Sequence, residues 1–107
     1  MVTMKRGEVW WANLPPPAGK RPVLLLSRNA AYAVRSLVTV APTARTVRNI
    51  PAEVPLGPAD GLPQPCVVNC DSIVTISKAL LAERITVLGP VKLAAVNAAI
   101  RFALFIG

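Results

Sequence analysis

Proline is the residue that most limits what this chain can fold into. Eleven prolines lie between positions 15 and 90, and six of them fall within residues 42–65. Proline lacks a backbone N–H, so it removes a hydrogen bond from a strand ladder, and it breaks a helix beyond the first turn. The segments between the prolines are short and rich in apolar and β-branched residues. The sequence therefore predicts a mainly β fold of short strands, with a longer helix only from residue 90.

Short strands are expected where apolar and β-branched residues run together between turn signals. The segment 21–27 is apolar almost throughout, which is typical of a strand buried on both faces. A length of 107 residues suits one compact domain spanning 1–107. Strands are expected at 8–14, 21–27, 36–41, 66–76 and 83–88, with a shorter strand near 52–56 and one helical turn at 77–81.

The last segment is expected to form a helix that opens at Gly89 and Pro90, because proline is favoured at the first helical position. A second apolar group on this helix, Phe102, Phe105 and Ile106, leaves two interpretations open. The group forms a contact between two copies of the chain, or the helix is buried wholly within one domain. The expected core-facing stripe consists of Leu93, Val96, Ile100, Ala103 and Leu104.

The charge balance favours a polyanionic partner. Twelve Lys and Arg stand against five Asp and Glu, which gives a formal net charge of +7. On a small domain this excess makes nucleic acid the leading ligand class. The basic residues are spread along the chain, which disfavours an anionic membrane surface.

Histidine is absent, which excludes a Ser-His-Asp triad, a Cys-His nucleophile and a His-ligated zinc site. The acidic residues are too far apart in sequence to suggest the carboxylate cluster of a two-metal nuclease. We therefore expect chemistry without a metal ion or another cofactor. The five acids are Glu8, Glu53, Asp60, Asp71 and Glu83.

Cys66 and Cys70 stand four residues apart in a β-branched segment. On a strand this spacing separates the two Cα atoms by about 13 Å, whereas a disulfide needs them within about 7 Å. Such a pair can be redox-active, bind a metal or consist of buried reduced thiols, and the strand-like surroundings favour buried thiols. The N-terminal segment lacks the apolar run of a secretory signal, so a cytoplasmic protein is expected.

Basic residues flank the expected strands of the first half. Such residues gathered by the loops of a sheet would attract a phosphate backbone, although Arg21 could equally pair with one of the few acids. Exposed aromatic rings could stack bases, but one of two adjacent tryptophans on a strand must face the core. The basic residues are Lys20, Arg21, Arg28, Arg45 and Arg48, and the aromatic candidates are Trp10, Trp11 and Tyr32.

Several segments match a known pattern when they are taken together. Residues 5–14 read Lys-Arg-Gly-Glu-Val-Trp-Trp-Ala-Asn-Leu, and after a Pro/Gly loop residues 20–27 read Lys-Arg-Pro-Val-Leu-Leu-Leu-Ser. Val-Ala-Pro-Thr at 40–43, Gly-Leu-Pro at 61–63, Asp-Ser-Ile-Val-Thr-Ile at 71–76, the strand around Arg84 and the terminal helix continue the match. Over nearly its whole length the chain resembles the MazF/PemK toxins of bacterial toxin–antitoxin systems.

The resemblance implies a small SH3-like β-barrel of the CcdB/PemK type with a C-terminal α-helix. It implies a type II toxin that acts as a homodimer and cleaves single-stranded RNA at specific sequences, leaving 2′,3′-cyclic phosphate and 5′-hydroxyl ends without a metal. The partner would be a cognate antitoxin with an extended acidic segment, which suits a basic surface. Arg21 and Thr43 would occupy the catalytic positions.

The chemistry of these two side chains fits those positions. A guanidinium offers up to five donors to a charged phosphorane, and a threonine hydroxyl can hold a non-bridging oxygen. Arginine stays protonated near neutral pH, so it stabilises charge more readily than it carries protons. Asp71 and Glu8 are the candidates for the general base.

RNA contacts are expected from Lys20, Arg28, Arg45, Arg48, Asn69, Asp71 and Ser72. Asn69 and Asp71 lie two apart on an expected strand, so they would face the same way and contact base edges together, or they would satisfy each other beside a loop. Ser72 and Val74 stand where the family's Gln-Ile-Arg-Thr pattern has glutamine and arginine.

Two other hypotheses are compatible with the same architecture. The first is a non-enzymatic toxin of the CcdB type that inhibits DNA gyrase through its C-terminal helix. The second is a catalytically degenerate RNA-binding module, which the valine at position 74 would suit. Changing Arg21 and Thr43 separates a ribonuclease from a gyrase poison, because only the ribonuclease would lose toxicity.

Overall fold

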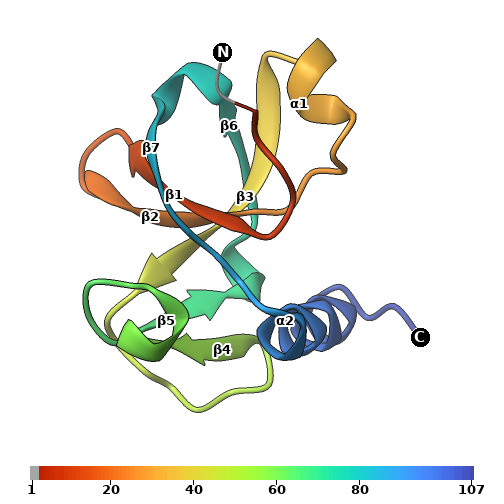
Figure 1. Cartoon of the computed structure of the whole chain (residues 1–107). Coiled ribbons are helices and arrows are strands. Elements are labelled where there is room, and N and C mark those ends of the chain that lie inside the picture. The colour runs from red at the N-terminus through yellow and green to blue at the C-terminus, as the bar shows by residue number, and fades with distance from the viewer. Residues whose placement is uncertain (1–2) are drawn as a thin grey trace.

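A computed structural model describes residues 3–107. Within these residues the chain forms seven strands, two α-helices and three 3₁₀ turns (Figure 1). The strands are β1 (Glu8–Asn13), β2 (Lys20–Leu25), β3 (Leu37–Ala44), β4 (Glu53–Leu56), β5 (Cys66–Asn69), β6 (Val74–Ser77) and β7 (Leu81–Val87). The helices are α1 (Ala31–Val34) and α2 (Pro90–Ala103), and the 3₁₀ turns are η1 (Pro58–Asp60), η2 (Cys70–Ser72) and η3 (Lys78–Leu80).

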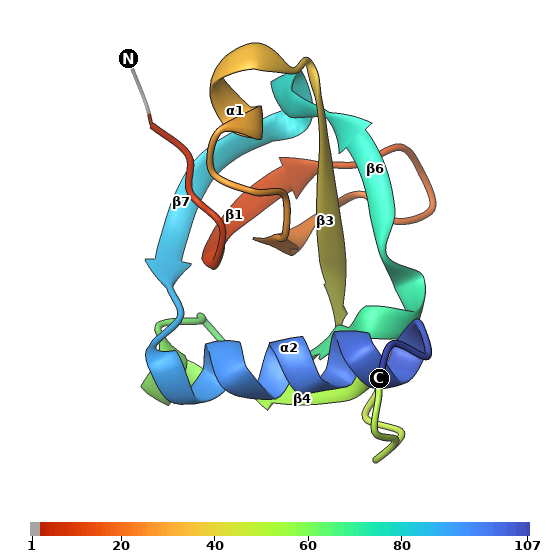
Figure 2. The same ribbon diagram turned by 90° about the vertical axis from the view of Figure 1, so that its right-hand side faces the viewer.

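The strands form one antiparallel arrangement in the order β4-β5-β3-β2-β1-β7, with β6 also paired to β3. Figure 2 shows these strands curling into a small, partly open barrel, with α2 lying beside β4. Register shifts on β1 on either side of Trp10 and Trp11 help the curl, because a bulge increases the local twist of a strand. The predicted mainly β fold with a C-terminal helix is confirmed.

The central strands are buried on both faces, as the apolar run at 21–27 predicts. The buried side chains form two clusters, and successive residues of β2 contribute to different ones. Leu24 packs in the cluster that includes residues of α2, whereas Val23 and Leu25 face the interior of the barrel. Trp10 lies in the barrel core with 3% of its surface exposed. Because side chains alternate along a strand, Trp11 faces the other way and is only half-buried.

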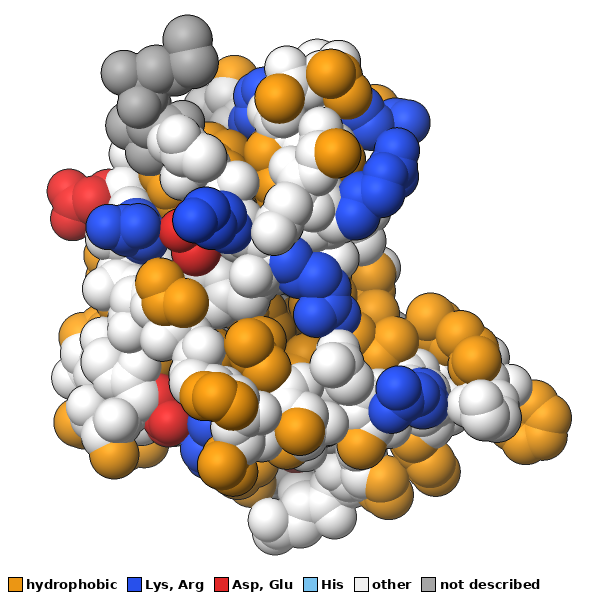
Figure 3. All heavy atoms as spheres, turned by 45° about the vertical axis from the view of Figure 1, so that its right-hand side comes forward, with side chains coloured by type: hydrophobic (Ala, Val, Ile, Leu, Met, Phe, Trp, Pro, Cys, Tyr) orange, Lys and Arg blue, Asp and Glu red, His pale blue; other side chains and the backbone are white. Residues whose placement is uncertain are grey.

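Helix α2 begins at Pro90 as predicted. Of the expected stripe, Val96 is buried and Leu93, Ile100 and Ala103 pack against the same core, which also contains Ala99, a residue outside the expected stripe. Leu104 is 56% exposed, so its assignment to the core is wrong; the helix ends at Ala103, and this residue lies beyond the last turn. Phe102 and Phe105 are 58% and 96% exposed, so a helix buried wholly within the domain is also wrong. Figure 3 shows hydrophobic side chains gathered where α2 ends.

The prediction of one continuous strand over residues 66–76 is wrong in its middle. It divides into β5 and β6 around η2, because the Asn69 side chain accepts a hydrogen bond from the backbone N–H of Asp71 at 2.9 Å. Asparagine favours this local turn over a continuous ladder. Cys66 begins β5 and Cys70 begins η2, and both are buried free thiols, which confirms the preferred explanation of the pair.

Helix α1 had no prediction from the sequence, and it carries Tyr32 into the barrel core, where the ring is 5% exposed. The expectation that Tyr32 could stack on a base is therefore wrong. Neither helix in the described part of the chain is long and apolar enough to span a membrane.

Candidate functional site

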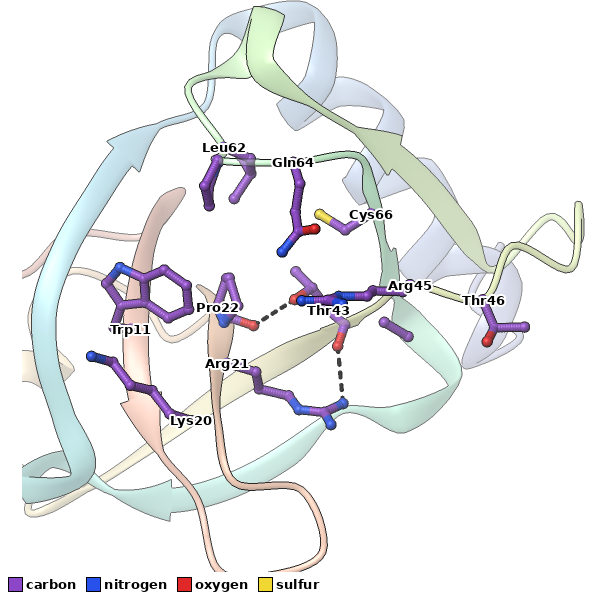
Figure 4. Close-up of a pocket in the computed structure, with 12 residues that line it drawn as sticks. Trp11, Lys20, Arg21, Pro22, Thr43, Arg45, Thr46, Leu62, Gln64 and Cys66 are labelled. Atoms are coloured by element: carbon purple, nitrogen blue, oxygen red, sulfur yellow. Dashed lines mark hydrogen bonds between the residues drawn. The ribbon is translucent and has the colours of Figure 1, made fainter.

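A pocket of about 430 Å³ opens where β1, β2 and β3 meet the loop that leads into β5 (Figure 4). It brings together both residues expected to be catalytic and two of the expected RNA contacts, and we call it the Arg21–Thr43 pocket. Its lining consists of Trp11, Lys20, Arg21, Pro22, Thr43, Ala44, Arg45, Thr46, Leu62, Pro63, Gln64 and Cys66.

Arg21 lies near the start of β2 and is held in place by two backbone carbonyls. Its Nε donates to the carbonyl oxygen of Ala18 at 3.1 Å, and its Nη1 donates to the carbonyl oxygen of Thr43 at 3.2 Å. These bonds fix the guanidinium between the β1–β2 loop and β3, while further N–H groups stay free to bind a ligand. The ion pairs within residues 3–107 are Arg84–Glu8 and Lys92–Asp60, so the interpretation of Arg21 as a structural ion-pair partner is wrong.

Thr43 lies near the end of β3, opposite Val68 of β5, and is 4% exposed. Its hydroxyl donates to the carbonyl oxygen of Pro22 at 2.9 Å. In this arrangement the hydroxyl oxygen can accept a hydrogen bond from a ligand. To donate to a phosphate oxygen, the hydroxyl has to turn away from Pro22.

The lining of the pocket is cationic. Lys20, Arg21 and Arg45 contribute positive charge, and none of the twelve lining residues is acidic. The Lys20 ammonium lies 5.3 Å from the centroid of the Trp11 ring, within the range of a cation–π contact. An anion is therefore favoured here, beside an aromatic ring.

One wall of the pocket comes from the loop after η1. Gly61 turns the chain there with φ +94°, and a Cβ at this position would overlap the Thr86 side chain. The turn buries Leu62 and brings Gln64 to the opening, where its amide points toward Pro22 and Thr43 (Figure 4). Gln64 was not among the site residues expected from the sequence. Its only signal there is its position just after the Gly-Leu-Pro motif.

The other expected RNA contacts do not line this pocket. Arg28 is exposed in the loop before α1, and Arg48 is exposed in the loop between β3 and β4. Asn69 ends β5, and Asp71 and Ser72 lie in η2. The expectation that Asn69 and Asp71 share one face of a strand is wrong, and the alternative of a local bond between them holds through the Asp71 N–H.

Neither carboxylate considered as a general base lines the pocket. Glu8 is 3% exposed and accepts hydrogen bonds from the backbone N–H of Lys5, from Trp10 Nε1 and from Arg84 Nη1, at 3.0, 3.0 and 3.2 Å. Its role in the described structure is to hold the N-terminal segment, β1 and β7 together. Asp71 is exposed on η2.

Comparison with known proteins gives a consistent result. The family model of the PemK-like, MazF-like toxin of type II toxin–antitoxin systems matches residues 5–104. The probable endoribonuclease MazF5 of Mycobacterium tuberculosis is 38% identical over 99 residues, which cover 92% of this chain and 90% of the relative.

Solved structures agree with the sequence comparison. The Mycobacterium tuberculosis toxin MazF-mt6 superposes with a TM-score of 0.86 at 36% identity, covering 94% of this chain and 98% of that one. A mycobacterial endoribonuclease in complex with its cognate antitoxin has the same TM-score at 31% identity, covering 97% of both chains.

Proposed function

The chain belongs to the PemK-like, MazF-like toxin family of type II toxin–antitoxin systems, and from this we propose that it is an endoribonuclease that cleaves single-stranded RNA at specific sequences without a metal. The observation that carries the proposal is the Arg21 guanidinium held against the Thr43 carbonyl in a cationic pocket that also holds the Thr43 hydroxyl. Cleavage of this kind would stop translation and growth.

The proposed reaction is an internal transesterification. The ribose 2′-oxygen forms a bond to the neighbouring phosphorus, the bond from phosphorus to the 5′-oxygen breaks, and the products carry a 2′,3′-cyclic phosphate and a 5′-hydroxyl. Charge accumulates on the non-bridging oxygens as the phosphorane forms. We assign the stabilisation of that charge to the free N–H groups of Arg21; the bonds from this guanidinium to the Ala18 and Thr43 carbonyls, which orient it, support the assignment.

Thr43 has a second, separable task in this proposal. Its hydroxyl turns from the Pro22 carbonyl to a non-bridging oxygen and holds the phosphate in register with Arg21. Since no carboxylate lines the pocket, the proton of the 2′-hydroxyl passes to water, and water returns a proton to the 5′-oxygen. Glu8 and Asp71 are not needed for either transfer.

RNA would reach the Arg21–Thr43 pocket over a surface of net positive charge. Within the pocket we assign Lys20 and Arg45 to neighbouring phosphates. The more distant expected contacts, Arg28, Arg48, Asn69, Asp71 and Ser72, stay predictions for the RNA on either side.

The proposal includes the partners of a cytoplasmic toxin. Two copies of the chain would join through the exposed apolar end of α2, and a cognate antitoxin with an extended acidic segment would compete with RNA for the cationic pocket. One related structure is an endoribonuclease in complex with its cognate antitoxin, which supports this partner. The gyrase and binding-only hypotheses are not favoured, because the matched relatives are named endoribonucleases.

The test is incubation of the purified protein with a long single-stranded RNA in excess EDTA, followed by mapping of the new ends. Wild type should give cyclic phosphate and 5′-hydroxyl ends, and Arg21→Ala should lower the rate by at least about 100-fold, as the loss of a transition-state donor does. Arg35→Ala is the matched control, because this exposed arginine lies outside the pocket. Intact RNA with folded, antitoxin-free wild type would overturn the proposal.

A further inference from the structure

The Arg21–Thr43 pocket contains an aromatic ring and a free amide that the proposed cleavage chemistry does not use. Trp11 is half-buried on its wall, whereas the other two aromatic candidates, Trp10 and Tyr32, are buried in the barrel core. Trp11 pairs with Pro22 across β1 and β2, which places the indole beside the β2 residues that carry the catalytic group. Of these three rings, only the Trp11 ring is accessible to a base at the proposed cleavage site.

The Gln64 side chain supplies a polar group on the opposite wall. Gln64 is exposed, its amide points into the opening, and it makes no hydrogen bond to another residue that lines the pocket (Figure 4). An amide presents a donor and an acceptor side by side, which matches the adjacent donor and acceptor on the edge of a nucleobase. The Gly61 turn and the bond from Gly57 N–H to the Asp60 carboxylate at 3.0 Å hold the base of this loop in place.

Resting on the proposed function, we propose that Trp11 and Gln64 form a base-recognition subsite next to the scissile phosphate. The base stacks on the indole, and the Gln64 amide reads its polar edge. Lys20, 5.3 Å from the centre of the Trp11 ring, binds the phosphate attached to the stacked nucleotide. A volume of about 430 Å³ lies within the range of small-ligand pockets and accommodates one nucleotide.

The subsite makes Gln64 a specificity-determining residue with no part in bond cleavage. Its replacement should therefore change which sequence is cut and preserve the ability to cut. A bidentate contact between a side chain and a base discriminates by about 5- to 150-fold. Stacking by Trp11 tolerates any base, so its loss should weaken binding by a similar factor without changing the preferred sequence.

The experiment is sequencing of all cleavage sites in a randomised single-stranded RNA pool for wild type, Gln64→Ala and Gln64→Glu. Gln64→Ala should relax the preference at one nucleotide position next to the cut, and Gln64→Glu, which can only accept, should shift that position toward bases with an exocyclic amino group. Thr75→Ala is the matched control, because this exposed residue of β6 lies outside the pocket. An unchanged preference in both Gln64 variants, or loss of cleavage at every sequence by a folded variant, would overturn the subsite.

Trp11 needs a pair of variants because it also contributes to packing. Trp11→Phe keeps an aromatic face, whereas Trp11→Leu keeps apolar volume only. We expect KM to rise by about 5- to 150-fold in Trp11→Leu and by much less in Trp11→Phe, with thermal unfolding showing that both are folded. Equal effects in both folded variants would overturn the stacking role.

A binding experiment separates failure of the subsite from failure of the proposed function. RNA selected from the same pool by an Arg21→Ala protein reports base preference without cleavage. A preference that Gln64→Ala removes in this background supports the subsite even if wild type cleaves no RNA. Selected RNA with no preference that depends on Gln64 overturns the subsite whether or not wild type is a ribonuclease.

Discussion

Glu8 is the most heavily engaged acid in the described chain, and its surroundings explain its place at the start of β1. Its two carboxylate oxygens accept from a backbone N–H, an indole N–H and a guanidinium, so the buried charge is compensated on every side. A buried carboxylate is tolerated only with such partners. The motif at residues 5–14 therefore contains an acid whose contacts in the structure hold the fold together and do not line the pocket.

Replacement of Glu8 by glutamine should destabilise the protein while leaving the chemistry intact. The amide NH₂ of Glu8→Gln would face either Arg84 or the Trp10 N–H, which sets a donor against a donor and costs about 1–3 kcal/mol. Glu83→Gln, an exposed neighbour on β7, should change the free energy of unfolding by less than about 0.5 kcal/mol. Urea unfolding measures both, and loss of RNA cleavage by folded Glu8→Gln would instead place this carboxylate in the reaction.

Cys70 predicts a specific loss of stability at alkaline pH. Burial raises the pKa of this thiol from 9.0 to about 11, and the nearby Asp71 carboxylate adds to the shift. Between these two pH values the unfolded chain releases the thiol proton and the folded chain keeps it, so the free energy of unfolding falls by about 2–3 kcal/mol as pH rises. Urea unfolding from pH 8 to 11 should show a shallower decline for Cys70→Ala, and parallel declines would contradict the assignment.

Among the elements, the central strands and α2 follow from local pattern, whereas the η2 turn does not. The apolar run of β2 and the Pro90 start of α2 need no information from the rest of the chain. The break at η2 depends on one side chain, Asn69, bonding the backbone two residues ahead in place of a ladder. β-branched residues on both sides of it conceal this competition in the sequence.

The site was predictable to the extent that its residues flank strands or belong to a recognisable motif. Arg21 and Thr43 came from family resemblance, and Lys20 and Arg45 came from their places beside strands. Gln64 could not be found in this way, because its approach to Trp11 depends on the Gly61 turn folding a distant loop over β2. Position beside a strand also led to a residue that does not line the pocket, because Arg48 follows β3 in sequence and yet lies outside it.

The exposed end of α2 predicts a dimer that can be separated without unfolding. Phe102→Ser with Phe105→Ser removes two side chains that are more than half exposed, so the monomer should keep its stability while self-association weakens by at least about tenfold. Val91→Ser is the matched control, because this 82% exposed valine lies in the first turn of the same helix. Sedimentation velocity over a concentration series reports the change, and an unaltered dimer in the double variant would place the interface elsewhere.

At the scale of the whole molecule, the ion pairs within the described residues lie outside the Arg21–Thr43 pocket and the cations inside it are unpaired. Two of the five acids are engaged in ion pairs, Glu8 with Arg84 at 3.2 Å and Asp60 with Lys92 at 3.9 Å. The pocket cations Lys20, Arg21 and Arg45 form no ion pair within residues 3–107. The net charge of +7 is thus least compensated where the proposal places the RNA backbone.

This distribution predicts how RNA affinity depends on salt. Each phosphate that a cation neutralises releases counterions and adds about 0.7 to the slope of log affinity against log salt for a single strand. Lys20→Ala and Arg45→Ala should each reduce the slope by about that amount, whereas Arg35→Ala should leave it unchanged because this arginine lies outside the pocket. Binding is measured by fluorescence anisotropy with RNA whose 2′-hydroxyls are methylated, which removes the nucleophile and prevents cleavage. Equal slopes for wild type and both pocket variants would mean that the backbone follows another face, and the Arg21–Thr43 pocket would then not be where RNA binds.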